Sequence, residues 1–301
     1  MKRRRLRAST TEAIAGYLFA SPVILGLVIW VILPMFGVLA ISLTDWNVLR
    51  APRWVGVQNY VKLFTTDLYF WNSLKVTAYF VVLNVACTVL YSLVVALLLN
   101  QKIRGRGIYR SFFYLPTIIP VVASSALWSW LFNPEFGLLN VLLQAVKLHR
   151  SLWLAAQTTV VPSIVLMTVW AGAGNTIVIF LAALQGVPRE LLEAVEIDGG
   201  TWWHRFRAIT LPMISPVTFF NVVTGLIASF TIFTQSYIMT NGGPNNASLF
   251  YVLLLYREAF QRNNFGGAAA LSWVLIIIVS VLSLLIFRTS SRWVYYEGEA
   301  R

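Results

Sequence analysis

The chain contains 301 residues, of which 58% are apolar and only 11% are charged. A soluble globular domain is about 45–50% apolar and about 25% charged, so this chain has too little polar surface for a water-soluble globule. Its composition predicts an all-α membrane protein. The formal net charge of +12 does not indicate a nucleic-acid partner, because the basic residues lie at the edges of apolar segments.

Six segments of more than 20 residues lack Asp, Glu, Lys and Arg, and each is long enough for one helical crossing, which needs roughly 20 apolar residues. Clusters of Asn, Gly and Pro, such as residues 240–246, trim the longer segments. The sequence predicts a single transmembrane domain over residues 1–301 with six membrane spans, at about 14–42, 76–99, 111–132, 160–184, 215–239 and 269–287.

The distribution of Lys and Arg predicts the orientation of the chain. If the N-terminus lies inside, the inner segments hold 15 of these residues and the outer segments hold 8. Cytoplasmic loops carry the excess of positive charge, so we expect both termini to be cytoplasmic. The basic start Lys2–Arg7 precedes an uncharged run that is too long for a cleaved signal peptide. We therefore expect an uncleaved first helix, with Pro22 and Pro34 kinking it or setting its ends.

Sequence patterns of enzymes and metal sites are absent. The chain has no G-x-x-x-x-G-K-[ST] loop for phosphate binding, and neither His149 nor His204 has a partner at metal-ligand spacing. We expect no catalytic activity, cofactor or metal in this chain. The predicted spans also lack Asp, Glu, Lys and Arg, which argues against a proton-coupled carrier and favours a neutral solute. Sodium coupling through backbone carbonyls stays open.

The inner loop 186–213 breaks the positive-inside trend with a net charge of −1. Its pattern predicts a helix that begins near Pro188, a break at Gly199-Gly200, and a second amphipathic turn that carries Trp202 and Trp203. Such a projection fits a groove in a soluble partner. The alternative is an interfacial helix that lies on lipid with its Trp residues as anchors.

Motifs in this loop resemble a known family. Glu193-Ala194-Val195, then Gly199, then Ile209-Thr210-Leu211-Pro212 resemble the E-A-A…G…I-x-L-P motif of permease subunits in binding-protein-dependent ABC importers. Val195 replaces the usual second alanine, and Gly200 stands where alanine is frequent. Further segments are similar to the carbohydrate-uptake branch, including maltose and glycerol-3-phosphate permeases: Leu184–Pro188, Asp198, Phe206 and Tyr237–Pro244.

The resemblance implies the type I importer permease architecture in a bacterial or archaeal cytoplasmic (inner) membrane. It implies a second permease chain, two ATPase subunits that bind ATP and Mg and dock at 186–213, and an extracytoplasmic solute-binding protein. Membrane lipids surround the chain. The residues that the resemblance assigns to ATPase coupling are Glu190, Glu193, Ala194, Asp198, Gly199, Phe206, Leu211 and Pro212.

Candidate residues for the solute pathway lie on the predicted fourth and fifth spans. On the fifth span, small and polar side chains recur at three- and four-residue steps and share one helix face, which suits either close helix packing or a hydrated pathway. Maltose-type permeases bind solute on this part of the span, so the resemblance favours the pathway. On the fourth span, an aromatic ring and an amide suit a sugar. The candidates are Trp170, Asn175, Asn221, Gly225, Ser229, Ile232 and Gln235.

The sequence analysis thus predicts the membrane-spanning subunit of an ABC importer for a mono- or oligosaccharide. Alternatives are a permease for another small solute such as glycerol phosphate, a secondary transporter or channel that works without ATP, and a membrane scaffold. Gln235 stands where the carbohydrate branch often has Asp, which bears on the solute class.

Overall fold

The computed structural model describes residues 10–102 and 104–295. These residues form two compact units: the first comprises the described residues up to Thr66 with Glu258–Val274, and the second comprises Asp67–Arg257 with the described residues from Leu275 onward. The basic residues Lys2–Arg7 lie outside the described ranges. That the chain forms one transmembrane domain with both termini in the cytoplasm stays a prediction.

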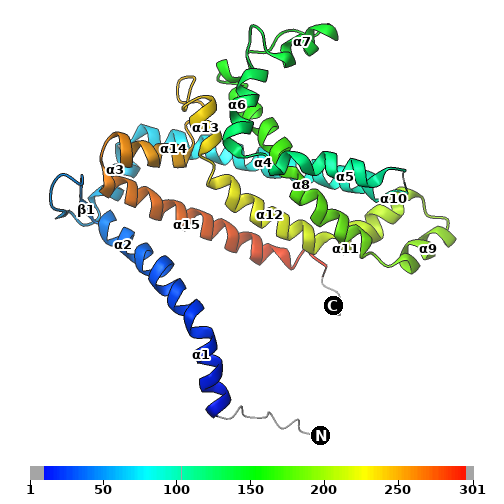
Figure 1. Ribbon diagram of the computed structural model, residues 1–301, viewed down its shortest axis with the longest axis horizontal. Coiled ribbons are helices and arrows are strands. Elements are labelled where there is room, and N and C mark those ends of the chain that lie inside the picture. Colours follow the sequence, from blue (N-terminus) through cyan, green and yellow to red (C-terminus); the bar gives the residue numbers. More distant parts are fainter. Residues whose placement is uncertain (1–9, 103, 296–301) are drawn as a thin grey trace. The chain divides into compact units, whose positions relative to one another are not determined.

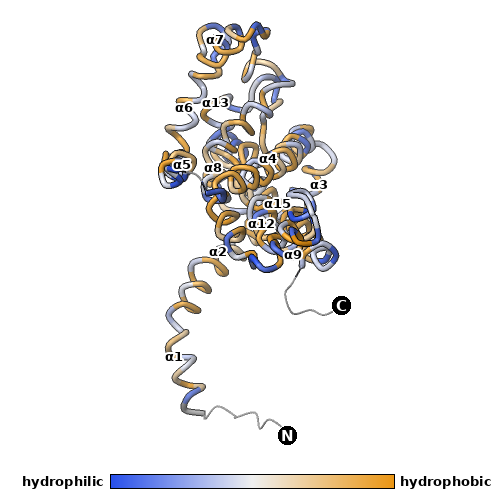
Figure 2. The backbone as a smooth tube through the Cα atoms, turned by 90° about the vertical axis from the view of Figure 1, so that its right-hand side faces the viewer, coloured by the Kyte–Doolittle hydropathy of each residue, from blue (hydrophilic) through white to orange (hydrophobic). Residues whose placement is uncertain are grey.

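The first unit begins with a long apolar helix made of α1 (Thr10–Leu27), a π-helical turn η1 (Val28–Ile32) and α2 (Leu33–Ser42). Pro34 explains the wide turn, because a proline ring clashes with the carbonyl four residues earlier in a regular α-helix. The Leu33 N–H instead bonds the Val28 carbonyl, five residues earlier. The apolar side chains of this helix are exposed within the structure, and Figure 2 shows the hydrophobic character of α1.

The remainder of the first unit consists of a two-stranded sheet and short helical segments. Strand β1 (Thr44–Asp45) pairs antiparallel with β2 (Arg53–Trp54), and Thr44 lies opposite Trp54. Helix α3 (Gln58–Thr65) follows, and its Asn59 side chain donates hydrogen bonds to the carbonyls of Ser42 (2.8 Å) and Thr44 (2.9 Å). The π-helical turn η5 (Arg257–Gln261) leads into α15 (Phe265–Ser290), which begins in this unit.

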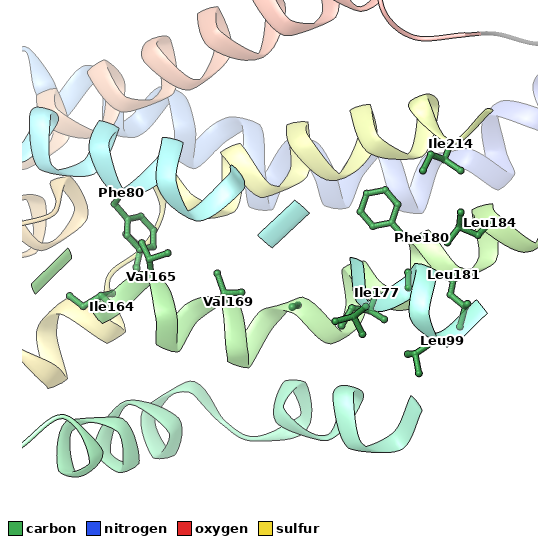
Figure 3. Packing of buried hydrophobic residues seen from close by; sticks show 14 of the residues in the cluster. Phe80, Leu99, Ile164, Val165, Val169, Ile177, Phe180, Leu181, Leu184 and Ile214 are labelled. Carbon is green, nitrogen blue, oxygen red and sulfur yellow. The ribbon is translucent and has the colours of Figure 1, made fainter. Parts of the chain in front are cut away.

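The second unit is built on α4 (Leu68–Asn100) and α8 (Val160–Gln185), which pack along each other (Figure 1). Asp67 caps α4 by accepting a hydrogen bond from the Tyr69 N–H at 2.8 Å. From Val169 onward, buried residues of α8 recur every three or four positions, as a packed helix face requires, and Figure 3 shows Val165, Val169 and Ile177 in this core.

Two bent helix pairs complete the set of helices that are long and apolar enough to cross a membrane. The first consists of α5 (Arg106–Tyr114) with η2 (Leu115–Ile118), followed by α6 (Val121–Leu131) after a bend of 99°. The second bend, of 61°, separates α10 (Trp202–Arg205), η4 (Phe206–Thr210) and α11 (Leu211–Met213) from α12 (Ser215–Phe230).

Shorter elements join these helices. They are α7 (Leu138–Ala145), η3 (Trp153–Ala155), α9 (Arg189–Ile197), α13 (Thr234–Met239) and α14 (Tyr251–Tyr256). By length and composition, four helices of the described residues are able to cross a membrane alone, and up to six spans result if each bent pair counts as one. The prediction of six spans agrees with the larger count.

The structure differs from the predicted spans most clearly at three places. Helix α4 begins at Leu68 and not near residue 76, because a helix accommodates one basic residue, Lys75. The predicted helix 111–132 is broken before Pro120, where the preceding Ile119 is extended (ψ 127°), as proline favours in its neighbour. The predicted helix 215–239 ends at Phe230 and resumes at Thr234.

Candidate functional site

A cavity of about 500 Å³ lies in the second unit between α4, α8, α12 and the chain segment that follows α12. Amide and hydroxyl side chains alternate with apolar ones on its walls. Among the residues that the structure describes, none of those lining the cavity is ionisable. Its volume is within the range of small-molecule sites, about 300–1,000 Å³.

Helix α12 supplies one wall through side chains that recur every fourth residue. Asn221, Gly225 and Ser229 line the cavity, as their shared helix face predicts. The helix ends at Phe230, yet Ile232 and Gln235 also line the cavity. The turn after α12 therefore keeps these two residues on the cavity wall, although the helix is not continuous.

Helix α8 supplies a second wall with Thr168, Gly172 and Asn175. Trp170 is not among the lining residues; its ring packs against Trp128 with centroids 5.5 Å apart. The reason is helical periodicity: two residues rotate a side chain by about 200° around the axis, which places Trp170 on the face opposite Thr168. Of the candidates for the solute pathway, Trp170 alone lies elsewhere.

Asn84 on α4 is a cavity residue that the sequence analysis did not select. Its side chain is 8% exposed, and its amide nitrogen donates a hydrogen bond to the Ser229 hydroxyl oxygen at 2.9 Å. Its amide oxygen has no hydrogen-bond partner. The available signal was a single amide in the middle of the uncharged run 76–101, four residues before Thr88, which lines the same cavity.

Asn221 offers the cavity a free hydrogen-bond donor, whereas Asn84 offers a free acceptor. It is 6% exposed, and its amide nitrogen has no hydrogen-bond partner. A buried amide group without a partner costs about 1–3 kcal/mol, so such groups call for a polar ligand or water. The two side chains leave one acceptor and one donor unused, and a hydroxyl group satisfies both kinds.

The segment 186–213 contains a helix that ends at a glycine. Residues Glu190, Glu193 and Ala194 lie on the exposed side of α9, Asp198 follows its last residue, and Gly199 has a φ of +77°. The hydrogen bonds from Gly200 N to the Val195 carbonyl (2.8 Å) and from Gly199 N to the Glu196 carbonyl (3.0 Å) close the helix end. This pattern, with glycine in the left-handed region, is the Schellman motif.

The outward face of α9 combines acid and apolar groups. Ile197 is 86% exposed and Leu191 is also exposed, next to the carboxylates of Glu190 and Glu193. Leu192 and Val195 are half-buried instead. An exposed face of this kind is typical of a surface that another protein covers.

Val195 and Gly200, the two departures from the family motif, lie against each other. A Cβ atom added at Gly200 would lie 2.5 Å from Val195 Cγ1 and 2.7 Å from the Val195 carbonyl oxygen. Those distances leave no room for alanine at position 200 while valine occupies position 195. The structure therefore connects the two substitutions, which the sequence showed only as separate changes.

The second half of the segment is held by aromatic rings and a surface ion pair. Trp202 stacks on Phe206 with centroids 5.5 Å apart and an angle of 6° between the rings. Arg205 pairs with Glu196 across the glycine turn. Leu211 and Pro212 follow a π-helical turn in which the Leu211 N–H bonds the Phe206 carbonyl, so Pro212 is accommodated as Pro34 is.

Among the described residues, no group of three or more His, Cys, Asp or Glu gathers into a potential metal site.

Comparisons with known proteins agree with the architecture. Residues 88–291 match the family model described as "Binding-protein-dependent transport system inner membrane component". The chain is 38% identical to the probable ABC transporter permease protein YesP of Bacillus subtilis, over 98% of this chain and 96% of that one. It is 31% identical to the trehalose/maltose transport system permease protein MalF of Thermococcus litoralis, over 89% and 90% of the two chains.

A solved structure has a similar fold. It is a chain from a bacterial ABC transporter involved in the import of the acidic polysaccharide alginate, and it superposes with a TM-score of 0.80. The match covers 94% of this chain and 96% of that chain at 23% sequence identity. At that identity the likeness establishes the fold.

Proposed function

Because this chain belongs to the family of binding-protein-dependent transport system inner membrane components, we propose that it forms the solute pathway of an ABC importer for a neutral mono- or oligosaccharide. The proposal rests on the cavity between α4, α8 and α12. Its amide and hydroxyl groups offer many hydrogen bonds without a fixed charge. A sugar presents the matching set of hydroxyl donors and acceptors.

Asn84, Asn221 and Ser229 are the proposed hydroxyl-binding residues. The unused acceptor of Asn84 and the unused donor of Asn221 would each gain a hydrogen bond from a solute hydroxyl. Rejection of an analogue that lacks the hydroxyl follows, because it would leave buried polar groups unpaired. The relative named as a trehalose/maltose permease supports the same class of solute.

An anionic solute such as glycerol phosphate is the less suitable alternative. Phosphate sites use Arg, Lys or a helix N-terminus. The lining residues within the described part of the chain include no basic side chain. Glycerol phosphate would therefore enter the cavity without a compensating positive charge.

The energy for transport is proposed to come from partner subunits. The chain has no phosphate-binding loop of its own, so ATP and Mg would bind to two ATPase subunits that dock at the segment 186–213. A second permease chain would complete the pathway, and an extracytoplasmic binding protein would deliver the solute. ATP and the loaded binding protein would both favour the outward-open state of the pair.

Reconstitution in proteoliposomes tests this function. The chain, its partner permease and ATPases, and the cognate binding protein would be assayed for ATP hydrolysis and solute uptake with trehalose, maltose, lactose, maltotriose and glycerol 3-phosphate. We expect stimulation by a neutral sugar and no flux through this chain alone. Flux through the isolated chain, or stimulation only by glycerol 3-phosphate, would overturn the proposal.

A further inference from the structure

Three aromatic rings form a cluster beside the cavity, at the end of α12 opposite the segment 186–213. Phe233 stacks on Tyr237 with ring centroids 5.3 Å apart and an interplanar angle of 18°. Tyr256 of α14 packs against both rings, at 5.1 Å from Phe233 and 5.4 Å from Tyr237. We name this set, Phe233, Tyr237 and Tyr256, the aromatic cluster.

The aromatic cluster connects the cavity with the surface of the second unit. Phe233 is one of the lining residues of the cavity. Tyr237, stacked on it, is 41% exposed. The rings thus form a continuous apolar surface that begins outside the cavity and ends on its wall, next to the amide groups.

A side-chain hydrogen bond with Tyr237, followed by the electrostatic influence of the same residue, raises the pKa of Tyr256 above its ordinary value. Tyr256 lies outside the predicted membrane spans, and it stays neutral at physiological pH. The cluster consequently offers neutral aromatic faces with fixed relative orientation, and it brings no charge to the cavity.

Packing alone is an incomplete account of these rings. Aromatic residues in a buried core are shielded on all sides, whereas Tyr237 is exposed and Phe233 borders open space. Aromatic residues also serve as anchors at a membrane interface, but an anchor does not need to line a cavity. The position between an exposed surface and a polar cavity favours a ligand.

We propose that the aromatic cluster is a stacking surface for a pyranose ring of the solute on its way into the cavity. The C–H faces of a pyranose are apolar and pack on aromatic rings, while its hydroxyl groups need hydrogen-bonding partners. The cluster supplies the first chemistry and the adjacent amides supply the second. This assignment rests on the proposed sugar-import function.

The ratio of ATP hydrolysed to sugar imported tests the assignment. The complete importer would be reconstituted with the sugar of the panel that most stimulates the wild-type complex. Tyr237→Leu and Tyr256→Leu remove a stacking face, so the binding protein would still trigger ATP hydrolysis while fewer sugars enter. Stacking of typical strength corresponds to a rise in this ratio of roughly 2- to 10-fold.

Matched variants separate contact with the sugar from a structural role. Tyr237→Phe keeps the ring and should keep the ratio within about twofold of wild type. Phe220→Leu changes a 52% exposed ring of α12 that does not line the cavity, and it should leave the ratio unchanged. Co-purification of all subunits verifies assembly. If Tyr256→Leu does not assemble, the exposed Tyr237→Leu decides alone.

The outcomes also distinguish this assignment from the proposed function. If no sugar stimulates the wild-type complex, sugar import itself is contradicted and the assignment falls with it. If a sugar stimulates wild type but the ratio in Tyr237→Leu equals that of wild type, only the stacking assignment is overturned. A proportional loss of hydrolysis and import would indicate a structural role and also overturn it.

Discussion

Gly200→Ala tests whether Val195 and Gly200 act as a compensating pair at the end of α9. A Cβ atom at position 200 would lie 2.5 Å from Val195 Cγ1 and 2.7 Å from the Val195 carbonyl oxygen, where ordinary contacts are 3.4–4 Å. Overpacking of this kind costs about 1–3 kcal/mol. Moving the carbonyl also weakens its 2.8 Å hydrogen bond from the Gly200 N–H, worth about 0.5–1.5 kcal/mol.

The expected loss is therefore about 1.5–4.5 kcal/mol in the stability of the wild-type turn. The low end applies, because the segment is exposed and relaxes more easily than a core. If the ATPase subunits bind only the wild-type conformation of this turn, every 1.4 kcal/mol by which that conformation is destabilised lowers their affinity about tenfold. We expect Gly200→Ala to weaken ATPase binding by about tenfold or more, while membrane insertion is unchanged.

The assay is the affinity of the purified permease pair for the ATPase subunits in a double-mutant cycle. Val195→Ala removes the Cγ1 contact but leaves the carbonyl contact, so Val195→Ala/Gly200→Ala should recover part of the affinity. Gly107→Ala is the control, because a Cβ there meets nothing within 4 Å. Wild-type affinity for Gly200→Ala, or equal affinities for the single and double variants, would refute the reasoning.

Three other substitutions have distinct expected outcomes. Gly199→Val places a β-branched residue at a φ of +77°, which costs at least about 1–2 kcal/mol; it should weaken ATPase association without affecting insertion, and full association by co-purification would contradict this. Asn84→Leu removes the hydrogen bond to Ser229 and an unused acceptor, and should lower sugar uptake about tenfold or more, equivalent to about 1.4 kcal/mol or more, while complex assembly is retained; unchanged uptake would remove Asn84 from the site. Ser229→Trp fills the cavity and should block uptake with assembly intact, whereas uptake at the wild-type rate would exclude Ser229 from the pathway.

The helical architecture was largely predictable from the uncharged apolar runs. Helix α8 (Val160–Gln185) begins at the predicted residue and ends one residue beyond the prediction, and the polar residues Gln157, Thr158 and Thr159 precede it within the uncharged run 151–188. Lys75 misled the prediction for α4, since the charge was taken as the limit of the span. The gap at 231–233 has no Gly or Pro, and its β-branched Thr231 and Ile232 are only a weak signal.

The candidate site was predictable on one helix at a time. Four-residue spacing on α12 grouped Asn221, Gly225 and Ser229, which line the cavity together. Asn84 is 145 positions from Ser229, and no local pattern relates the two residues. Trp170 was selected for its chemistry without regard to helix phase, and its ring faces away from Thr168.

The absence of ionisable groups from the cavity lining in the described residues has an electrical consequence. A membrane potential acts on each elementary charge that crosses it with about 2.3 kcal/mol per 100 mV. A neutral sugar held only by amides and hydroxyls would carry no charge through that field, and no lining group would move one with it. Uptake by this chain and its partners would therefore continue in a cell whose membrane potential has collapsed, as long as ATP remains.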